Sequence, residues 1–170
     1  MLPGARVRVL AYSVALLAGG IPAIAGLAGC VRFHVARPLP ESGFRAAIDL
    51  SRFPAGGRSG ETLEGQVTVA NQSDRVWPAA AWNAIGPVVN LAYHWRALDD
   101  TVLVNDGLRT PLPFDLGPER SATFKARAVL PKTPGRYLLE FDLVQEGVGW
   151  FAARGSPSAR IVFEVLEVSG

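Results

Sequence analysis

The chain has 170 residues, of which 49% are hydrophobic and 19% charged, and this length suits about one domain. Its 18 glycines and 13 prolines favour a β-rich domain with many turns over a helical bundle. The formal net charge is only +2 and the basic residues are scattered, so the sequence gives no reason to expect a nucleic acid as a partner.

Residues 1–29 predict a signal peptide. Arg6 and Arg8 form a short positive region, a long stretch of apolar and small residues follows, and no acidic residue occurs before Glu41. A single membrane-spanning helix that is not cleaved is the alternative, although Pro22 and several glycines weaken such a helix. Removal of this segment would leave 15 basic and 15 acidic side chains, a balance near zero.

The end of this segment, Leu27-Ala28-Gly29-Cys30, resembles the lipobox of bacterial lipoproteins. The resemblance implies that the signal is cut before Cys30 and that this residue carries lipid, which would anchor the protein to a membrane of the bacterial cell envelope, facing the periplasm or the cell exterior. Cys30 is the sole cysteine, so no disulfide can form within one chain. In the alternative of an uncleaved helix, Cys30 is an incidental small apolar residue.

The remaining chain is expected to contain a lipidated cysteine and tether over residues 30–43, with room for an edge strand near 31–35, and a single domain over 44–170. Residues 44–50 are a candidate strand, and residues 51–60 read as a loop by composition. Residues 62–70 alternate with the period of a half-buried strand. A polar turn follows at 71–74, and Trp77 is expected to fold back over the core.

The second half of the chain repeats this pattern. Strands are expected at 88–97, at 101–105 as its hairpin partner, at 121–130, at 136–143 and at 160–168, while the three prolines of 107–118 exclude a central strand there. About seven strands with turns between them predict an all-β fold, an antiparallel sandwich of the immunoglobulin or fibronectin type.

Residues 131–151 form the centre of this prediction. Tyr137, Leu139, Phe141 and Leu143 alternate on the face expected to point inward. The opposite face carries Arg136, Glu140 and Asp142, and its two carboxylates are expected to be solvated.

Two segments carry a second resemblance. Residues 67–73 with Trp77 resemble the opening of four-tryptophan (FW) immunoglobulin-like domains. The closing half of these domains resembles Pro131, residues 134–137, Leu139, Gly147, Gly149, Trp150 and Phe151. The same ending, with a preceding segment like 109–113, is similar to immunoglobulin-like accessory domains beside bacterial polysaccharide-synthesis enzymes. Both resemblances imply binding or assembly, not catalysis, and neither includes the N-terminal segment.

The sequence offers no catalytic constellation, cofactor motif or metal site. His34 and His94 are the two histidines, and His94 is expected to be a strand residue that points to solvent or has its hydrogen bond satisfied. A hydrolase would need a pocket that gathers His94 with a carboxylate. The glycines in 55–57 lack the Gly-Lys-Ser/Thr of a phosphate-binding loop.

The candidate ligand-binding residues are Trp82, Trp150, Arg109 and Glu146. An exposed tryptophan beside charged side chains would favour a module that recognises envelope polysaccharide. An exposed edge strand or apolar patch would favour a protein-interaction or assembly module instead. The sequence therefore predicts a non-catalytic binding or structural domain and leaves the choice between these two partners open.

Overall fold

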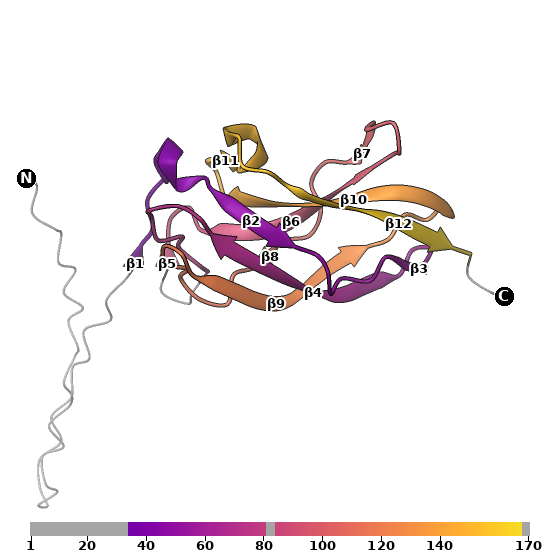
Figure 1. Cartoon of the computed structure of the whole chain (residues 1–170), viewed down its shortest axis with the longest axis horizontal. Coiled ribbons are helices and arrows are strands. Elements are labelled where there is room, and N and C mark those ends of the chain that lie inside the picture. Colours follow the sequence, from indigo (N-terminus) through magenta and orange to yellow (C-terminus); the bar gives the residue numbers. More distant parts are fainter. Residues whose placement is uncertain (1–33, 81–83, 168–170) are drawn as a thin grey trace, which may run out of the picture. The chain divides into compact units, whose positions relative to one another are not determined.

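The computed structural model describes residues 34–80 and 84–167, and these residues form β-strands joined by turns and two short 3-10 helices (Figure 1). The strands are β1 (His34–Val35), β2 (Ala46–Asp49), β3 (Gly56–Arg58), β4 (Thr62–Asn71), β5 (Ala84–Ile85), β6 (Val89–Arg96), β7 (Val102–Val104), β8 (Thr110–Pro111), β9 (Ser121–Val129), β10 (Gly135–Gln145), β11 (Gly149–Trp150) and β12 (Ala159–Leu166). The helices are η1 (Glu41–Gly43) and η2 (Ala152–Arg154).

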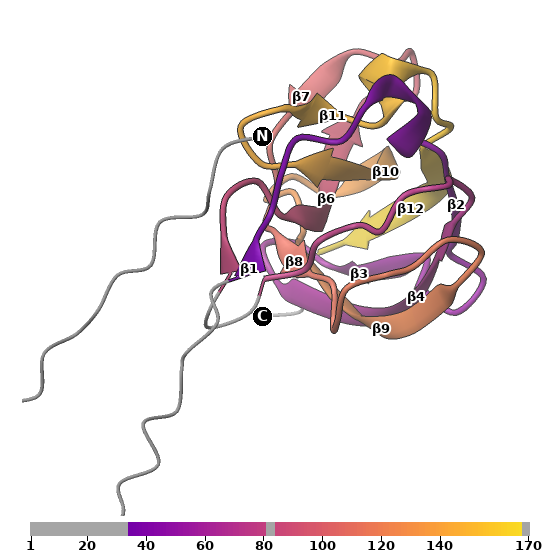
Figure 2. The same cartoon turned by 90° about the vertical axis from the view of Figure 1, so that its left-hand side faces the viewer.

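Two sheets face each other across the core, as the end-on view in Figure 2 illustrates. One sheet has the order β2-β4-β9, and the other has the order β3-β12-β10-β6-β7, with β8 paired to β6 and β11 paired to β10. Most neighbouring strands are antiparallel, whereas β3 runs parallel to β12. β1 and β5 form a separate parallel pair.

This strand order is that of an immunoglobulin-like sandwich. The N-terminal part of the domain contributes β2 to one sheet and β3 to the other, and the larger sheet is centred on β10 and β6. Trp95 on β6 is buried in the core, where immunoglobulin domains also place a tryptophan on the corresponding strand. The predicted all-β sandwich is confirmed.

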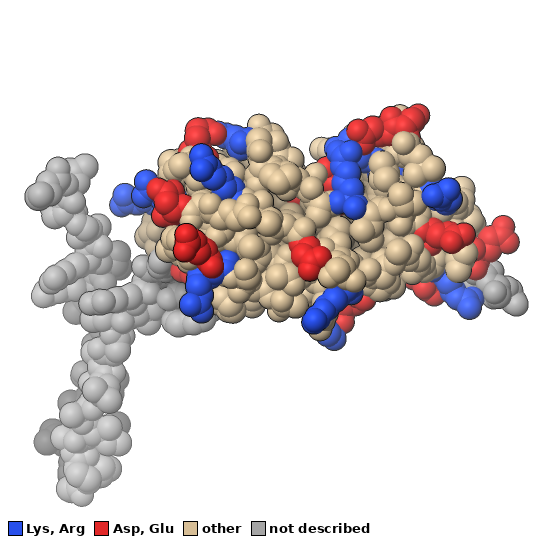
Figure 3. All heavy atoms as spheres, viewed as in Figure 1, with Lys and Arg blue, Asp and Glu red and all other residues tan. Residues whose placement is uncertain are grey.

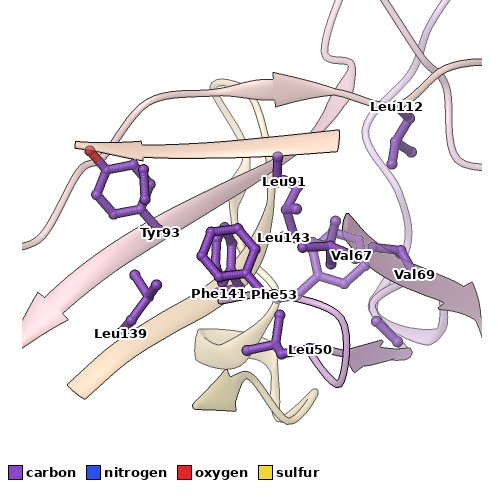
Figure 4. Packing of buried hydrophobic residues seen from close by; sticks show 14 of the residues in the cluster. Leu50, Phe53, Val67, Val69, Leu91, Tyr93, Leu112, Leu139, Phe141 and Leu143 are labelled. Atoms are coloured by element: carbon purple, nitrogen blue, oxygen red, sulfur yellow. The ribbon is translucent and has the colours of Figure 1, made fainter. Parts of the chain in front are cut away.

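The core is made by the inward faces of both sheets, and it follows the period-two pattern of the sequence. Val67 and Val69 on β4 and Leu91 on β6 are fully buried (Figure 4). Phe53 packs edge-on against Phe141 of β10 at a centroid distance of 4.9 Å. Such burial of aliphatic and aromatic side chains is the main favourable contribution to stability.

The polar turn after β4 is confirmed and has a specific hydrogen-bonding role. The Asn71 carboxamide oxygen accepts the backbone N–H of Ser73, and its Nδ2 donates to the carbonyl oxygens of Arg75 and Leu116. Trp77 lies over the core as expected, fully buried, and its indole N–H donates to the carbonyl oxygen of Gly43. One buried asparagine therefore ties the turn to a distant loop.

Two segments predicted to be loops contain short strands. Residues 51–60 include β3, which pairs with β12, and residues 107–118 include β8, which pairs with β6. Both are only two or three residues long, and they join the sheet by backbone hydrogen bonds that need no alternation of side chains. The loop predictions were therefore wrong at these residues.

The outer face of β10 also differs from expectation. Glu140 and Asp142, predicted to be solvated, are only 3% and 2% exposed, and His94 on the neighbouring strand is buried as well. The reason is that loops cover this face: the backbone N–H of Ala152 donates to Asp142, and the carbonyl oxygen of Asn105 meets His94. For His94 the expectation of a satisfied hydrogen bond is confirmed, and solvent exposure is not.

Candidate functional site: the Trp150 cluster

Three of the four predicted ligand-binding residues lie together on the outer face of the larger sheet. Trp150 is on β11, Glu146 follows the end of β10, and Arg109 precedes β8. Arg109 donates from Nε to Oε1 of Glu146 at 2.8 Å, and its Cζ lies 5.0 Å from the centre of the Trp150 ring. The sequence separates these residues by up to 41 positions, and the pairing of β11 with β10 and of β8 with β6 brings them together.

Two further residues complete the group, which we call the Trp150 cluster: Asn90, His94, Arg109, Glu146 and Trp150. The ring of His94 lies 4.5 Å from that of Trp150, and Nδ2 of Asn90 donates to Oε1 of Glu146 at 2.8 Å. Asn90 and His94 are both on β6 and share its outer face, as the alternation of this strand predicts. The sequence analysis predicted this strand, but it did not indicate that Asn90 and His94 belong to the site.

The imidazole of His94 is held neutral by its surroundings. Burial lowers its pKa, and this effect outweighs the opposing influence of the Asn105 carbonyl oxygen and of Glu140. Nδ1 lies 2.5 Å from that carbonyl oxygen, so Nδ1 is the nitrogen that carries the proton and donates it. A neutral ring against Trp150 supports the indole from one side without adding charge to the cluster.

The cluster keeps polar groups available for a ligand. Within residues 34–80 and 84–167, the indole N–H of Trp150, Nη2 of Arg109 and Oε2 of Glu146 make no hydrogen bond to protein. Oδ1 of Asn90, in contrast, is buried and has no hydrogen-bond partner among the described residues. The site therefore presents two donors and one acceptor to solvent beside a half-buried aromatic ring, with an unsatisfied amide oxygen next to them.

The fourth predicted residue, Trp82, lies outside the described residues, so its part in ligand binding stays a prediction. Across the described chain, no group of three or more His, Cys, Asp or Glu side chains has the arrangement of a metal site. No helix within that same part of the chain is long and apolar enough to cross a membrane.

A second surface feature lies at the edges of the two sheets, and we call it the β7 groove. It has a volume of about 530 Å³ and is lined chiefly by Tyr93, Trp95, Leu103, Val104, Val129 and Tyr137. β7 is an edge strand, and all three of its residues, Val102–Val104, are exposed and apolar. The sequence predicted this strand but did not indicate that its side chains would be exposed.

Charged side chains of both signs lie on the surface of the domain. On the face in Figure 3, basic and acidic side chains are scattered in small groups among uncharged residues. Several charged side chains of the described chain are paired, for example Lys125 with Glu64 at 2.8 Å and Arg160 with Asp100 at 2.9 Å. This face therefore has no extended field of one sign of the kind that would attract a polyanion.

No protein-family model matches the sequence, and the comparison with curated proteins finds no match. Among solved structures, the chain is similar to the CARDB domain of the PF1109 protein from Pyrococcus furiosus, with 14% identity, a TM-score of 0.43, and coverage of 72% of this chain and 86% of that one. It is also similar to the C-terminal domain of Wzt, with 13% identity, a TM-score of 0.42, and coverage of 73% and 72%. A β-glucosidase from Listeria innocua matches over 71% of this chain but 16% of its own, at 15% identity and a TM-score of 0.42. These are likenesses of fold alone.

Proposed function

We propose that this protein is a lipid-anchored, non-catalytic binding domain of the bacterial cell envelope and that the Trp150 cluster recognises polysaccharide. The observation that carries the proposal is the meeting of Trp150, Arg109 and Glu146, three residues from separate elements, in one partly exposed group. Sugar rings offer apolar C–H faces and hydroxyl groups. An indole surface with free donors and a free carboxylate oxygen complements both.

The surroundings of His94 support a role without catalysis. His94 and Glu140 lie directly opposite each other on β6 and β10, which is the kind of pair that a hydrolase would need. Both side chains are buried, however, and Glu140 is already bonded to Arg96, Arg160 and Ser158. A general base must reach its substrate, and this pair is closed to one.

The polysaccharide proposal is tested by affinity electrophoresis of the folded protein through gels that contain purified envelope polysaccharides. We expect Trp150→Ala to weaken binding about tenfold, since loss of one aromatic contact of roughly 1.4 kcal/mol has that effect. Glu146→Gln removes the carboxylate charge at nearly constant volume and should also weaken retention. Phe114→Ala is the matched control, because Phe114 is an exposed aromatic outside the cluster. Unchanged retention of folded Trp150→Ala and Glu146→Gln proteins would contradict the proposal.

A second candidate function is protein assembly, which the β7 groove favours. An edge strand with three exposed apolar side chains can pair with a strand from a partner protein. Natural proteins usually protect such edges with charged residues. Photo-crosslinking in cells from position 103 should then give a defined protein adduct that Val104→Lys abolishes. A crosslinker at Leu166, also exposed and apolar, serves as the control. The same adducts from both positions would argue against this function.

A further inference from the structure

Three exposed aliphatic side chains gather where the described chain begins, and we call them the tether-end patch: Val35, Val76 and Ile85. Their exposed fractions are 63%, 54% and 54%. Val35 and Ile85 are direct neighbours in the β1–β5 pair, and Val35 and Val76 line one surface groove of about 470 Å³. Figure 2 looks onto this end of the sandwich, with β1 near the viewer.

Arginines flank the patch. Arg37 and Arg75 line the same groove as Val35 and Val76, and none of the described residues that line it is a carboxylate. Arg75 pairs with the neighbouring Asp74 at 3.5 Å, while Arg37 makes no ion pair with any described residue. Apolar side chains beside guanidinium groups are the chemistry that suits the interface of a bilayer, where the aliphatic groups enter the acyl boundary and the cations meet anionic headgroups.

The chain is held firmly at this point. The buried carboxamide of Gln145 donates to the carbonyl oxygens of Arg37 and Pro87 and accepts the backbone N–H of Leu39. The N–H of Ala36 donates to the carbonyl oxygen of Ile85 at 2.8 Å. Gly86 has φ +112°, and a side chain there would meet the carbonyl oxygen of Ala36 at 2.4 Å. These contacts hold residues 36–39 against the rest of the domain.

We propose that the tether-end patch rests on the surface of an anionic lipid bilayer and sets the orientation of the domain on the membrane. This inference rests on the proposed lipid anchor at Cys30. Cys30 precedes Val35 by five residues in the sequence, a distance of at most about 18 Å of extended chain. An anchor so close would hold the patch at the interface, where even a weak surface attraction is effective because the contact is intramolecular.

The size of the patch favours a bilayer over a protein partner. A stable protein interface buries about 800 Å² on each side, far more than three aliphatic side chains present. Membrane contact needs no such area when a covalent anchor already provides the attachment. A bilayer contact also accounts for the position of the three exposed side chains, at the end of the domain where the described chain begins.

The test uses the full chain, purified from membranes and reconstituted into vesicles that contain phosphatidylglycerol. An environment-sensitive label is placed at Val76→Cys or Ile85→Cys, with Leu166→Cys as the matched control. Leu166 is 51% exposed and lies at the end of β12, away from β1 and β5 (Figure 1). We expect a nitroxide quencher carried in the lipid to act at least about threefold more strongly at positions 76 and 85 than at 166, and aqueous iodide to show the opposite order.

Equal quenching at all three positions would overturn the proposal. Arg37→Gln with Arg75→Gln, or vesicles of phosphatidylcholine alone, should reduce the lipid quenching, and free inorganic phosphate should leave it unchanged. The mass of the purified protein reports separately on acylation of Cys30. Acylated protein with unquenched labels would refute the patch and leave the anchor, whereas quenched labels on unacylated protein would support the patch and refute the anchor.

Discussion

Two carboxylates on one face of β10 have opposite electrostatic surroundings, although only one residue separates them. Burial acts to raise the pKa of Glu140, but hydrogen bonds from Ser158, Arg96 and Arg160 outweigh it and lower the value. Asp142 has no cationic partner of this kind among the described residues. Burial raises its pKa to about 6, against the opposing hydrogen bonds from the N–H groups of Ala152 and Leu143 and with a contribution from Glu140.

The raised pKa of Asp142 makes its ionised form a cost to the folded state near neutral pH. The folded protein binds this proton more tightly than the unfolded chain, so the contribution of Asp142 to the free energy of unfolding grows as pH falls from about 7 to about 4. The full change is about 3 kcal/mol. His94 acts in the opposite direction, because its lowered pKa reduces stability as pH falls below about 6.5.

We therefore predict that Asp142→Asn raises the free energy of unfolding at pH 7.5 by up to about 3 kcal/mol, because it removes a buried charge. The amide oxygen retains an acceptor for the N–H groups of Leu143 and Ala152. The advantage should be much smaller near pH 4.5, where Asp142 of the folded wild type is protonated. Urea denaturation at both pH values measures this difference and cancels the contribution of His94.

Asp74→Asn provides the control, since Asp74 is exposed. Its effect should be small at both pH values. If Asp142→Asn destabilised the protein equally at pH 7.5 and 4.5, the hydrogen bonds of the carboxylate would outweigh its charge, and the proposed origin of the pH dependence would be wrong.

At the scale of elements, β10 connects parts of the chain that are far apart in sequence. It pairs with β6 on one side and β12 on the other, and its last residue, Gln145, holds the segment that follows β1. The inward face of β10 contributes Leu139, Phe141 and Leu143 to the core. Its outward face carries the two carboxylates. One strand therefore connects the core, the covered outer face and the segment that follows β1.

Gln145→Leu is predicted to release the N-terminal segment without removing the core. The change keeps the side-chain size but leaves the N–H of Leu39 and the carbonyl oxygens of Arg37 and Pro87 without their partner. At about 1 kcal/mol for each of three hydrogen bonds, the expected loss of stability is about 3 kcal/mol. Hydrogen exchange followed by mass spectrometry should show faster exchange in residues 35–39 than in β4 and β6.

Gln66→Leu is the matched substitution at an exposed position on β4, and it should leave exchange in residues 35–39 unchanged. Slow exchange of residues 35–39 in the Gln145→Leu protein would mean that β1 and Ala36 alone are sufficient to hold this segment.

At the scale of the whole molecule, the sequence predicted the long strands well, because each of them turns one apolar face towards the core. β4, β6, β9, β10 and β12 alternate with period two, and their inward residues are those that the alternation indicated. β3 and β8 could not be predicted in this way. Their pairing depends on backbone hydrogen bonds to a strand that is distant in sequence, and their own side chains show no alternation that would indicate it.

The candidate site was predictable only in part. Arg109, Glu146 and Trp150 stood out as charged and aromatic residues near turns, but nothing in the local sequence placed Asn90 and His94 with them. The outer face of β6 and β10 reads as polar, and polarity alone predicts exposure. This face is buried because the segments before β8 and after β11 cover it in the folded protein. Both segments read as loops, and nothing in their sequence indicates which face they cover.

The Gln145 contacts have a mechanical consequence. A pull on the chain at Val35 is carried first by the short β1–β5 pair and then by the hydrogen bonds that Gln145 makes with Arg37 and Leu39. The strands of the core follow only after these bonds have opened. The segment up to Leu39 can therefore separate from the domain and lengthen under load while the sandwich stays folded, so a force applied at Val35 is absorbed there before it reaches the core strands.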